Sequence, residues 1–308
     1  MRRVQPWPQA QQPPLSTARS ELWIPRPALA SCVRGMIARD TRGVVLSTEQ
    51  RCNRFPAAPT CALLWYLQGS AELLWPGAEA TSRGTPIAPV TLCGPFSRPT
   101  VSVNPGPVHA FMVLLMPDAL TRLTGLDLAS LVDRIVPVEQ VFDAPWLDLC
   151  QAVADAPDDE QRVARVAAFL LPRWRDLRPQ APFSSHRLAD WAHSLALHAA
   201  TSGLGRSLRQ AQRRLERWTG STYRELRCLG RSERSFFHGV AAYRSGRVDW
   251  AQVAEESGYA DQSHLTRECR RITGLPPAQL LQRVADDESY WVYRLWGFDV
   301  DGDEASIF

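Results

Sequence analysis

Short apolar runs separated by glycine and proline dominate residues 22–141. Residues 108–115 form one such run, and the prolines that bound it predict a buried strand with defined ends. Residues 61–67 and 71–75 flank a short glycine turn, which predicts a hairpin. Several strands of this kind predict a β-sandwich or a small cupin-like barrel.

The apolar pattern changes to a helical period after residue 143. Residues 144–155 and 158–174 are predicted helices. In the second, apolar side chains recur at i, i+3, i+4 and i+7, namely Val163, Val166, Ala167 and Leu170. Such a stripe fits packing onto the β-rich half or a dimerisation helix. Two prolines within residues 178–182 then predict a linker.

From residue 186 to 283 the pattern is helical but broken at five glycine-containing points. This predicts a string of short helices. The expected fold class is therefore α+β multidomain, with a β-rich N-terminal part, further helices, and an all-α domain. The expected boundaries are a disordered Pro- and Gln-rich arm at 1–20, a sensor or dimerisation domain at 21–178, the all-α domain at 182–285, and an aromatic then acidic tail at 286–308.

Charge is distributed unevenly along the chain. All 35 basic residues are arginines, and residues 182–285 carry 16 of them against 9 acidic residues. Residues 286–308 carry 1 arginine against 7 acidic residues. A basic module beside an acidic tail is typical of a protein that binds a polyanion, although a solvated helical surface gives the same balance.

Cysteine and histidine spacing offers no catalytic or metal-binding motif. The seven cysteines are scattered without a C-x-x-C pair, which favours reduced thiols in a cytoplasm. The six histidines show no H-x-H or H-E-x-x-H spacing. His109 lies in an apolar strand and fits a structural role. We therefore expect no enzyme, no cofactor and no metal.

The strongest local pattern lies in residues 249–274. Asp249 is suited to cap a helix, and Gln252 three residues later completes a capping-box pattern. Val253 and Ala254 are predicted to face inward, and Ala254 is small enough for a second helix to cross closely. This segment therefore predicts the first helix of a helix pair.

A turn and a second helix follow. Gly258 predicts a left-handed turn that ends the first helix, and Asp261 is suited to cap the next. Apolar residues at i, i+4 and i+7 form the inner stripe of that helix, namely Leu265, Cys269 and Ile272. Helix, glycine turn and helix together predict a helix-turn-helix.

The opposite face of this second helix is polar, with few acidic residues. It holds Gln262, Ser263, Thr266, Arg267 and Arg270. Glutamine suits adenine, arginine suits guanine, and threonine suits a thymine methyl in the major groove. We expect the first four to contact bases and Arg270 to contact phosphate.

Residues 258–267 (GYADQSHLTR) and 273–278 (TGLPPA) resemble the signature of the AraC/XylS family of bacterial regulators. The resemblance implies two helix-turn-helix units joined by a long helix, with the signature in the second unit. Residues 54–57 (RFPA), the predicted hairpin and residues 114–125 resemble the divergent β-rich domain fused to such modules.

Residues 207–220 are similar to that family's first recognition helix. Ser207 would cap it, and the resemblance implies that Arg209, Gln212 and Arg213 face DNA. The predicted inner stripe comprises Leu208, Ala211, Leu215 and Trp218. Residues 221–239 resemble the connecting helix. Before Ser207 the chain departs from the family, with only a compressed equivalent of the usual turn.

These patterns predict a sequence-specific transcription regulator that binds double-stranded operator DNA. Arginines in residues 206–247 are expected to neutralise phosphates. A small-molecule effector, RNA polymerase and a second copy of the chain are the further partners expected. No apolar run approaches the ~20 residues of a membrane span, so a cytoplasmic protein is expected. Two alternatives remain: a DNA-repair or other enzyme fused to such a module, and a sequence-indifferent architectural DNA binder.

Overall fold

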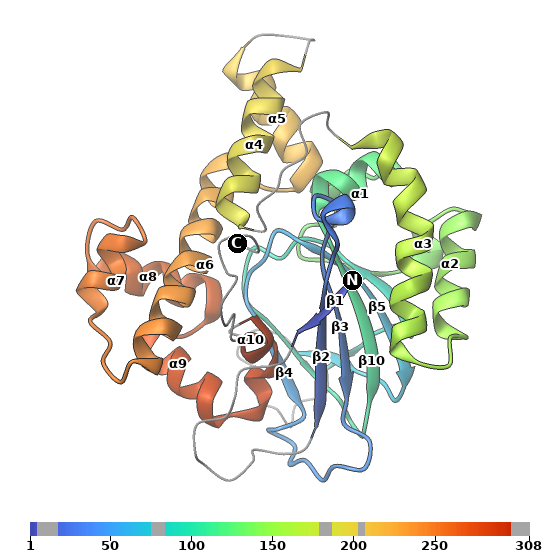
Figure 1. Ribbon diagram of the computed structural model, residues 1–308, viewed down its shortest axis with the longest axis horizontal. Helices are drawn as coiled ribbons and strands as arrows, with labels where there is room; N and C mark the ends of the chain where they lie inside the picture. The colour runs from blue at the N-terminus through green and yellow to red at the C-terminus, as the bar shows by residue number, and fades with distance from the viewer. Residues whose placement is uncertain (5–17, 75–83, 179–186, 203–206, 297–308) are drawn as a thin grey trace.

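The computed structural model describes residues 1–4, 18–74, 84–178, 187–202 and 207–296 (Figure 1). A β-rich N-terminal half is followed by a helical C-terminal half. The predicted α+β multidomain fold is thus confirmed. We call residues 1–178 the β-domain.

The first sheet, within the described residues, has seven antiparallel strands in the order β1-β2-β3-β10-β5-β8-β11. Their bounds are β1 Arg2–Val4, β2 Arg19–Ile24, β3 Val33–Asp40, β10 His109–Leu115, β5 Cys61–Gln68, β8 Val90–Cys93 and β11 Ile135–Pro137. Strand β10 sends Phe111 and Val113 into one apolar core and Ala110 and Met112 into another. Both of its faces are buried, which explains its uninterrupted apolar run.

The second sheet has the order β4-β9-β6-β7 among the described residues. Its strands are β4 Cys52–Phe55, β9 Thr100–Val103, β6 Glu72–Leu74 and β7 Thr85–Pro86. The hairpin predicted for residues 61–67 and 71–75 is wrong, because β5 pairs with β10 and β8 while β6 pairs with β9 and β7. The chain does turn at Gly69, with φ +81°, where a Cβ would lie 2.4 Å from the Pro107 carbonyl oxygen. That close approach directs the chain away from β5 and into the other sheet.

The N-terminal arm is partly ordered. Arg2–Val4 form β1, which pairs with residues 22–24 of β2. The expectation of a disordered arm over residues 1–20 is therefore wrong for these three residues and for the start of β2 at Arg19. Residues 5–17 lie outside the described part of the chain.

Strand β3 contains a β-bulge. Leu114 of β10 pairs with Gly35, and the next residue, Leu115, pairs with Val33. Arg34 is therefore the additional residue that has no partner across the ladder. Such an insertion changes which face the preceding side chains occupy.

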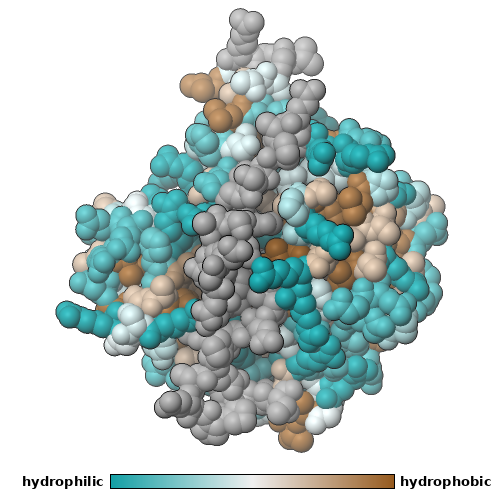
Figure 2. Space-filling model, in the orientation of Figure 1, coloured by the Kyte–Doolittle hydropathy of each residue, from teal (hydrophilic) through white to brown (hydrophobic). Residues whose placement is uncertain are grey.

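Helices of the β-domain cover one side of the first sheet (Figure 1). They are α1 Pro117–Thr124, α2 Ala144–Ala154 and α3 Asp159–Leu177, with short 3-10 turns η1 Pro27–Leu29, η2 Leu128–Leu131 and η3 Val138–Gln140. The predicted stripe of α3 is confirmed in Val163, Val166 and Leu170, which are buried. Leu171 and Leu177 are 41% and 42% exposed, and brown surface gathers on this side in Figure 2. A dimerisation role for α3 stays a prediction.

The C-terminal half consists of short helices around one long one. They are α4 Leu188–Thr201, α5 Leu208–Thr219, α6 Tyr223–Arg244, α7 Trp250–Glu256, α8 Gln262–Thr273, α9 Pro277–Asp286, η4 Glu288–Tyr290 and α10 Trp291–Trp296. Gly230 in α6 lets α4 approach, since a Cβ there would lie 2.8 Å from the Ala189 Cα. Helix α6 contacts two helix pairs, α4–α5 and α7–α8. We call these pairs the first and second units.

Candidate nucleic-acid interface

Helix α7 begins at the predicted cap. Asp249 Oδ1 accepts hydrogen bonds from the backbone N–H groups of Ala251, at 2.9 Å, and Gln252, at 3.3 Å. The capping-box pattern predicted that the Gln252 side chain would accept a hydrogen bond from the Asp249 N–H. Instead, Gln252 Nε2 donates to Glu256 Oε1 at 2.8 Å. Val253 and Ala254 are buried as predicted, with 3% and 1% exposed.

The turn between α7 and α8 has the expected glycine, Gly258, with φ +79°. Asp261 then caps α8 by accepting from the His264 N–H at 2.7 Å. Tyr259 is buried, and the Arg231 guanidinium of α6 lies 5.2 Å from its ring centre. Burial raises the pKa of the Tyr259 phenol to about 12. This tyrosine, which the sequence analysis did not single out, anchors the turn to α6.

Helix α8 presents the predicted polar face to solvent. Leu265, Cys269 and Ile272 are buried on its inner side. Of the five residues predicted to face DNA, the exposed ones are Gln262, Ser263, Arg267 and Arg270. Thr266 is half-buried, and its Oγ1 donates to the Gln262 carbonyl at 2.9 Å, so its methyl group is left for contacts. Teal, hydrophilic surface covers most of this side of the molecule (Figure 2).

Helix α5 is capped more completely than α8. Ser207 accepts from the Gln210 N–H at 3.3 Å, and the Gln210 side chain accepts from the Ser207 N–H at 3.4 Å. The residues predicted to face DNA, Arg209, Gln212 and Arg213, are all exposed. The structure therefore brings the candidate residues onto the outer faces of two capped helices.

The predicted inner stripe of α5 is wrong at one position. Leu215 is buried and Ala211 and Trp218 are half-buried, but Leu208 is 84% exposed. Leu208 is the first residue of α5, so no earlier turn of the same helix packs beside it. The helical period is correct and the error lies at the helix end.

The arginines of residues 206–247 have different roles. The exposed ones are Arg209, Arg213, Arg217, Arg224, Arg227, Arg244 and Arg247. Arg214 instead donates to the Ala199 carbonyl at 3.1 Å through Nε and 2.7 Å through Nη2, which ties α5 to α4. Arg206 lies outside the described residues.

Both units dock on the β-domain. In the first, Trp191 Nε1 donates to Asp118 Oδ1 at 2.9 Å, and Arg122 Nη2 donates to His198 Nε2 at 2.7 Å. In the second, the Ala57 N–H of the β-domain donates to the Ile272 carbonyl at the end of α8 at 2.8 Å. The recognition helices are therefore attached to the domain that precedes them.

A cavity of about 270 Å³ lies behind the second unit. Its walls come from both sheets, α6, the inner end of α8, α9 and α10. The lining is apolar apart from a few groups, including Arg34, Arg39 and Asn53. This shape suits a small, mostly apolar molecule.

Other titratable groups form no reactive cluster in the described part of the chain. No group of three His, Cys, Asp or Glu there could hold a metal ion. His109 Nε2 lies 3.1 Å from Asp159 Oδ1, so this histidine has the structural partner expected. Burial raises the pKa of the Cys93 thiol to about 12, which keeps it protonated. None of the described helices combines the length and apolar character needed to cross a membrane.

Comparison with known proteins agrees with this geometry. Residues 201–283 match the family model described as a helix-turn-helix domain. No curated protein matches the chain. The prediction of an AraC-type helix-turn-helix domain is confirmed for this segment, while the DNA contacts expected of individual residues stay a prediction.

Solved structures of ToxT from Vibrio cholerae show a faint likeness. An apo form is 12% identical with a TM-score of 0.36, over 80% of this chain and 96% of that chain. A second structure is 12% identical with a TM-score of 0.31, over 75% and 93%. Wild-type ToxT with a bound unsaturated fatty acid is 13% identical with a TM-score of 0.30, over 75% and 93%. TM-scores this low carry no argument about this chain.

Proposed function

Because the chain carries an AraC-type helix-turn-helix domain, we propose that it is a sequence-specific transcription regulator that acts on DNA in the cytoplasm. Helices α5 and α8 enter major-groove segments, and exposed arginines beside them neutralise phosphates. The base-contacting residues are Arg209, Gln212 and Arg213 in the first unit, and Gln262, Ser263, Thr266 and Arg267 in the second. Arg270 contacts phosphate.

The observation that carries this proposal is the outer face of α8. Its polar side chains are exposed, while the inner face is fixed by three buried residues and the start is fixed by Asp261. A helix held in this way presents its donors in one orientation, as base recognition requires. The fused-enzyme alternative finds no support in a metal-binding cluster among the described residues.

Selection from random duplexes, followed by footprinting, tests the proposal. Arg267→Ala should weaken binding to the selected duplex by ~1–3 kcal/mol and relax the preference at one base pair. Arg175→Ala is the matched control, since Arg175 is an exposed arginine on α3 whose side chain is 71% exposed. Equal affinities of Arg267→Ala and wild type would remove α8 from the base-reading role.

A small apolar effector in the cavity is the second part of the proposal. The Nε atom of Arg39 is buried and lacks a hydrogen-bond partner among the described residues. An effector with an acceptor group would satisfy this atom while its apolar body fills the cavity. RNA polymerase and a second copy of the chain stay predicted partners.

Filling the cavity tests the effector. Ala110 lines it and is 5% exposed. Wild type should increase the fluorescence of anilinonaphthalene sulfonate by binding it in the cavity, and Ala110→Phe should abolish that increase. Ala152→Phe on α2, at a half-buried position outside the cavity lining, is the control. Equal probe binding by Ala110→Phe and wild type would exclude this cavity as the site.

A further inference from the structure

The chain continues beyond the helix-turn-helix domain into a segment that returns to the β-domain. We call residues 287–296 the tail. Asp287 caps η4 by accepting from the Ser289 N–H at 3.0 Å and the Ser289 hydroxyl at 2.7 Å. Helix α10 then lies against β2 and β4 (Figure 1). The matched domain ends at residue 283, so the tail is additional to it.

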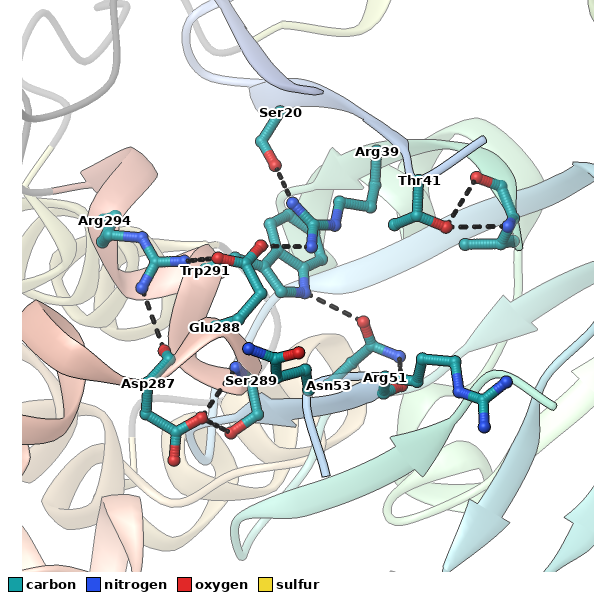
Figure 3. A network of polar contacts seen from close by, with 12 residues as sticks. Ser20, Arg39, Thr41, Arg51, Asn53, Asp287, Glu288, Ser289, Trp291 and Arg294 are labelled. Carbon is teal, nitrogen blue, oxygen red and sulfur yellow. Dashed lines mark hydrogen bonds and ion pairs between the residues drawn. The ribbon is translucent and has the colours of Figure 1, made fainter. Parts of the chain in front are cut away.

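A buried polar network holds the tail (Figure 3). Glu288 of η4 pairs with Arg39 of β3 through one carboxylate oxygen, and its other oxygen accepts from Arg294 at 2.6 Å. Arg39 also donates to the Ser20 hydroxyl at 2.7 Å. The side chains of Arg39 and Glu288 are only 5% and 3% exposed. One carboxylate thus binds an arginine from each domain.

Aromatic contacts reinforce this network. The Arg39 guanidinium lies 5.0 Å from the centre of the Trp291 ring. Trp291 Nε1 donates to Asn53 Oδ1 at 2.9 Å (Figure 3), and Asn53 donates in turn to Asn104 Oδ1 at 2.8 Å. Trp291 therefore packs against one β-domain side chain and is hydrogen-bonded to another.

Arg34 repeats the same arrangement five residues earlier on β3. It pairs with Glu233 of α6, and its guanidinium lies 5.1 Å from the centre of the Trp296 ring. Glu233 also accepts from the Leu188 N–H at 2.8 Å, at the start of α4. Trp296 lies close to Gly35, where a Cβ would meet its Cη2 at 3.4 Å and the Leu22 Cδ1 at 3.1 Å. Each β3 arginine thus joins a carboxylate of the C-terminal half to a tryptophan of the tail.

The energetics of buried ion pairs indicate what these contacts do. Burial lowers the pKa of Arg39 although Glu288 opposes that shift, so desolvation is substantial. Buried pairs add little net stability over an apolar core, but removing one partner strands a charge. Such a pair therefore favours one docked arrangement over all others, because any shift of the tail leaves an arginine or a carboxylate unpaired.

We propose that the tail is an interdomain latch, locked by Arg39, Glu288 and Arg294, that fixes the second unit to the β-domain. When the latch is closed, α9 and the second unit cannot turn about the end of α6. When it opens, they move as a separate body while the first unit stays docked. Trp291 and Trp296 also line the cavity, so an occupant there touches the latch directly.

Hydrogen exchange of the full-length protein, measured by mass spectrometry without DNA, tests the latch. Glu288→Gln leaves two buried arginines without a counter-charge, and exchange in residues 277–296 should rise at least about tenfold. Arg39→Met leaves the Glu288–Arg294 pair intact and should give a smaller rise in the same residues. Exchange in α5 should not change in either variant.

Asp286→Asn is the matched control, because it removes one negative charge from an exposed carboxylate two residues before Glu288. It should exchange like wild type. Wild-type exchange in both Glu288→Gln and Arg39→Met would overturn the latch, and so would an equal rise in α5. Because no DNA is present, failure of the latch is distinguishable from failure of the proposed DNA binding.

Discussion

The two helix-turn-helix units dock on the same β-domain through different chemistry. The first uses single side-chain hydrogen bonds, in which Trp191 donates to the buried carboxyl of Asp118 and Arg122 donates to His198 Nε2 at 2.7 Å. The second uses buried ion pairs and a tail that covers the sheet. Burial raises the pKa of Asp118 and lowers that of His198, so the first interface favours neutral forms of both groups.

This difference indicates which unit can be released. The docking contacts of the first unit come from side chains of α1 and α4, so they belong to the helices themselves. The ion pairs of the second unit belong to the tail, which lies outside α7 and α8 and shares an apolar core with Cys269 of α8. Because the tail carries these pairs, its opening would release the second unit from the β-domain, so the second unit is the mobile one in our proposal.

The largest expected effect comes from removing the aromatic anchor of the second unit. Trp291 is 3% exposed, and Trp291→Ala should lower the free energy of unfolding by about 3–5 kcal/mol. Urea denaturation followed by circular dichroism gives the value. A loss under about 1 kcal/mol would mean that the tail packs loosely, and the contrast between the units would fail.

A smaller loss is expected from crowding the first unit. Gly220 ends α5 with φ +68°, and a Cβ there would lie 2.6 Å from the Val132 Cγ2 of the β-domain. Gly220→Val should lower the free energy of unfolding by about 2–4 kcal/mol, from backbone strain and overlap together. Gly246→Val is the control, because Gly246 has φ +83° with no atom within 4 Å of its Cβ position. Equal losses in both variants would show that docking at Gly220 adds nothing beyond strain.

The smallest effect is a pH dependence confined to the first unit. Burial and the Arg122 charge lower the pKa of His198 from 6.5. Neutral His198 therefore contributes stability that is complete above pH 6.5 and is lost as the pH falls through the lowered value. Urea denaturation at about pH 7.5 and pH 5.5 should show that wild type loses more unfolding free energy at the lower pH than His198→Phe does. Phenylalanine keeps an aromatic ring at this position but cannot titrate. The same loss in both proteins would assign the pH effect to other groups.

Local signals in the sequence were sufficient to predict the second unit. Caps at Asp249 and Asp261, the turn at Gly258 and the buried stripe of α8 all depend on residues within four positions of one another. Short-range hydrogen bonds and helical period determine such features, so they can be inferred without knowing the rest of the fold.

Long-range pairing was not predictable in the same way. The contact between Arg39 and Glu288 joins positions 249 residues apart, and nothing in either local pattern identifies the partner. A usable signal did exist, since charged residues within the otherwise apolar strand segment 33–40 need buried partners. The hairpin prediction was wrong for a related reason, because strand pairing depends on the whole sheet. Strands β10 and β8 pair with the two edges of β5, so β6 cannot pair with it.

The bulge in β3 has a consequence for how this strand can change. Arg34 and Arg39 are five positions apart, which in a regular strand places them on opposite faces, yet both line the same cavity. The additional residue of the bulge shifts the alternation by one position, so both arginines lie on the same face of the strand. A single-codon deletion at position 34 would restore a regular ladder, bring Val33 next to Gly35 and leave one arginine instead of two on that wall. A protein that instead spaced two arginines four or six apart could keep both on one face with an unbroken strand, so sequence comparison at this strand should allow a one-residue gap.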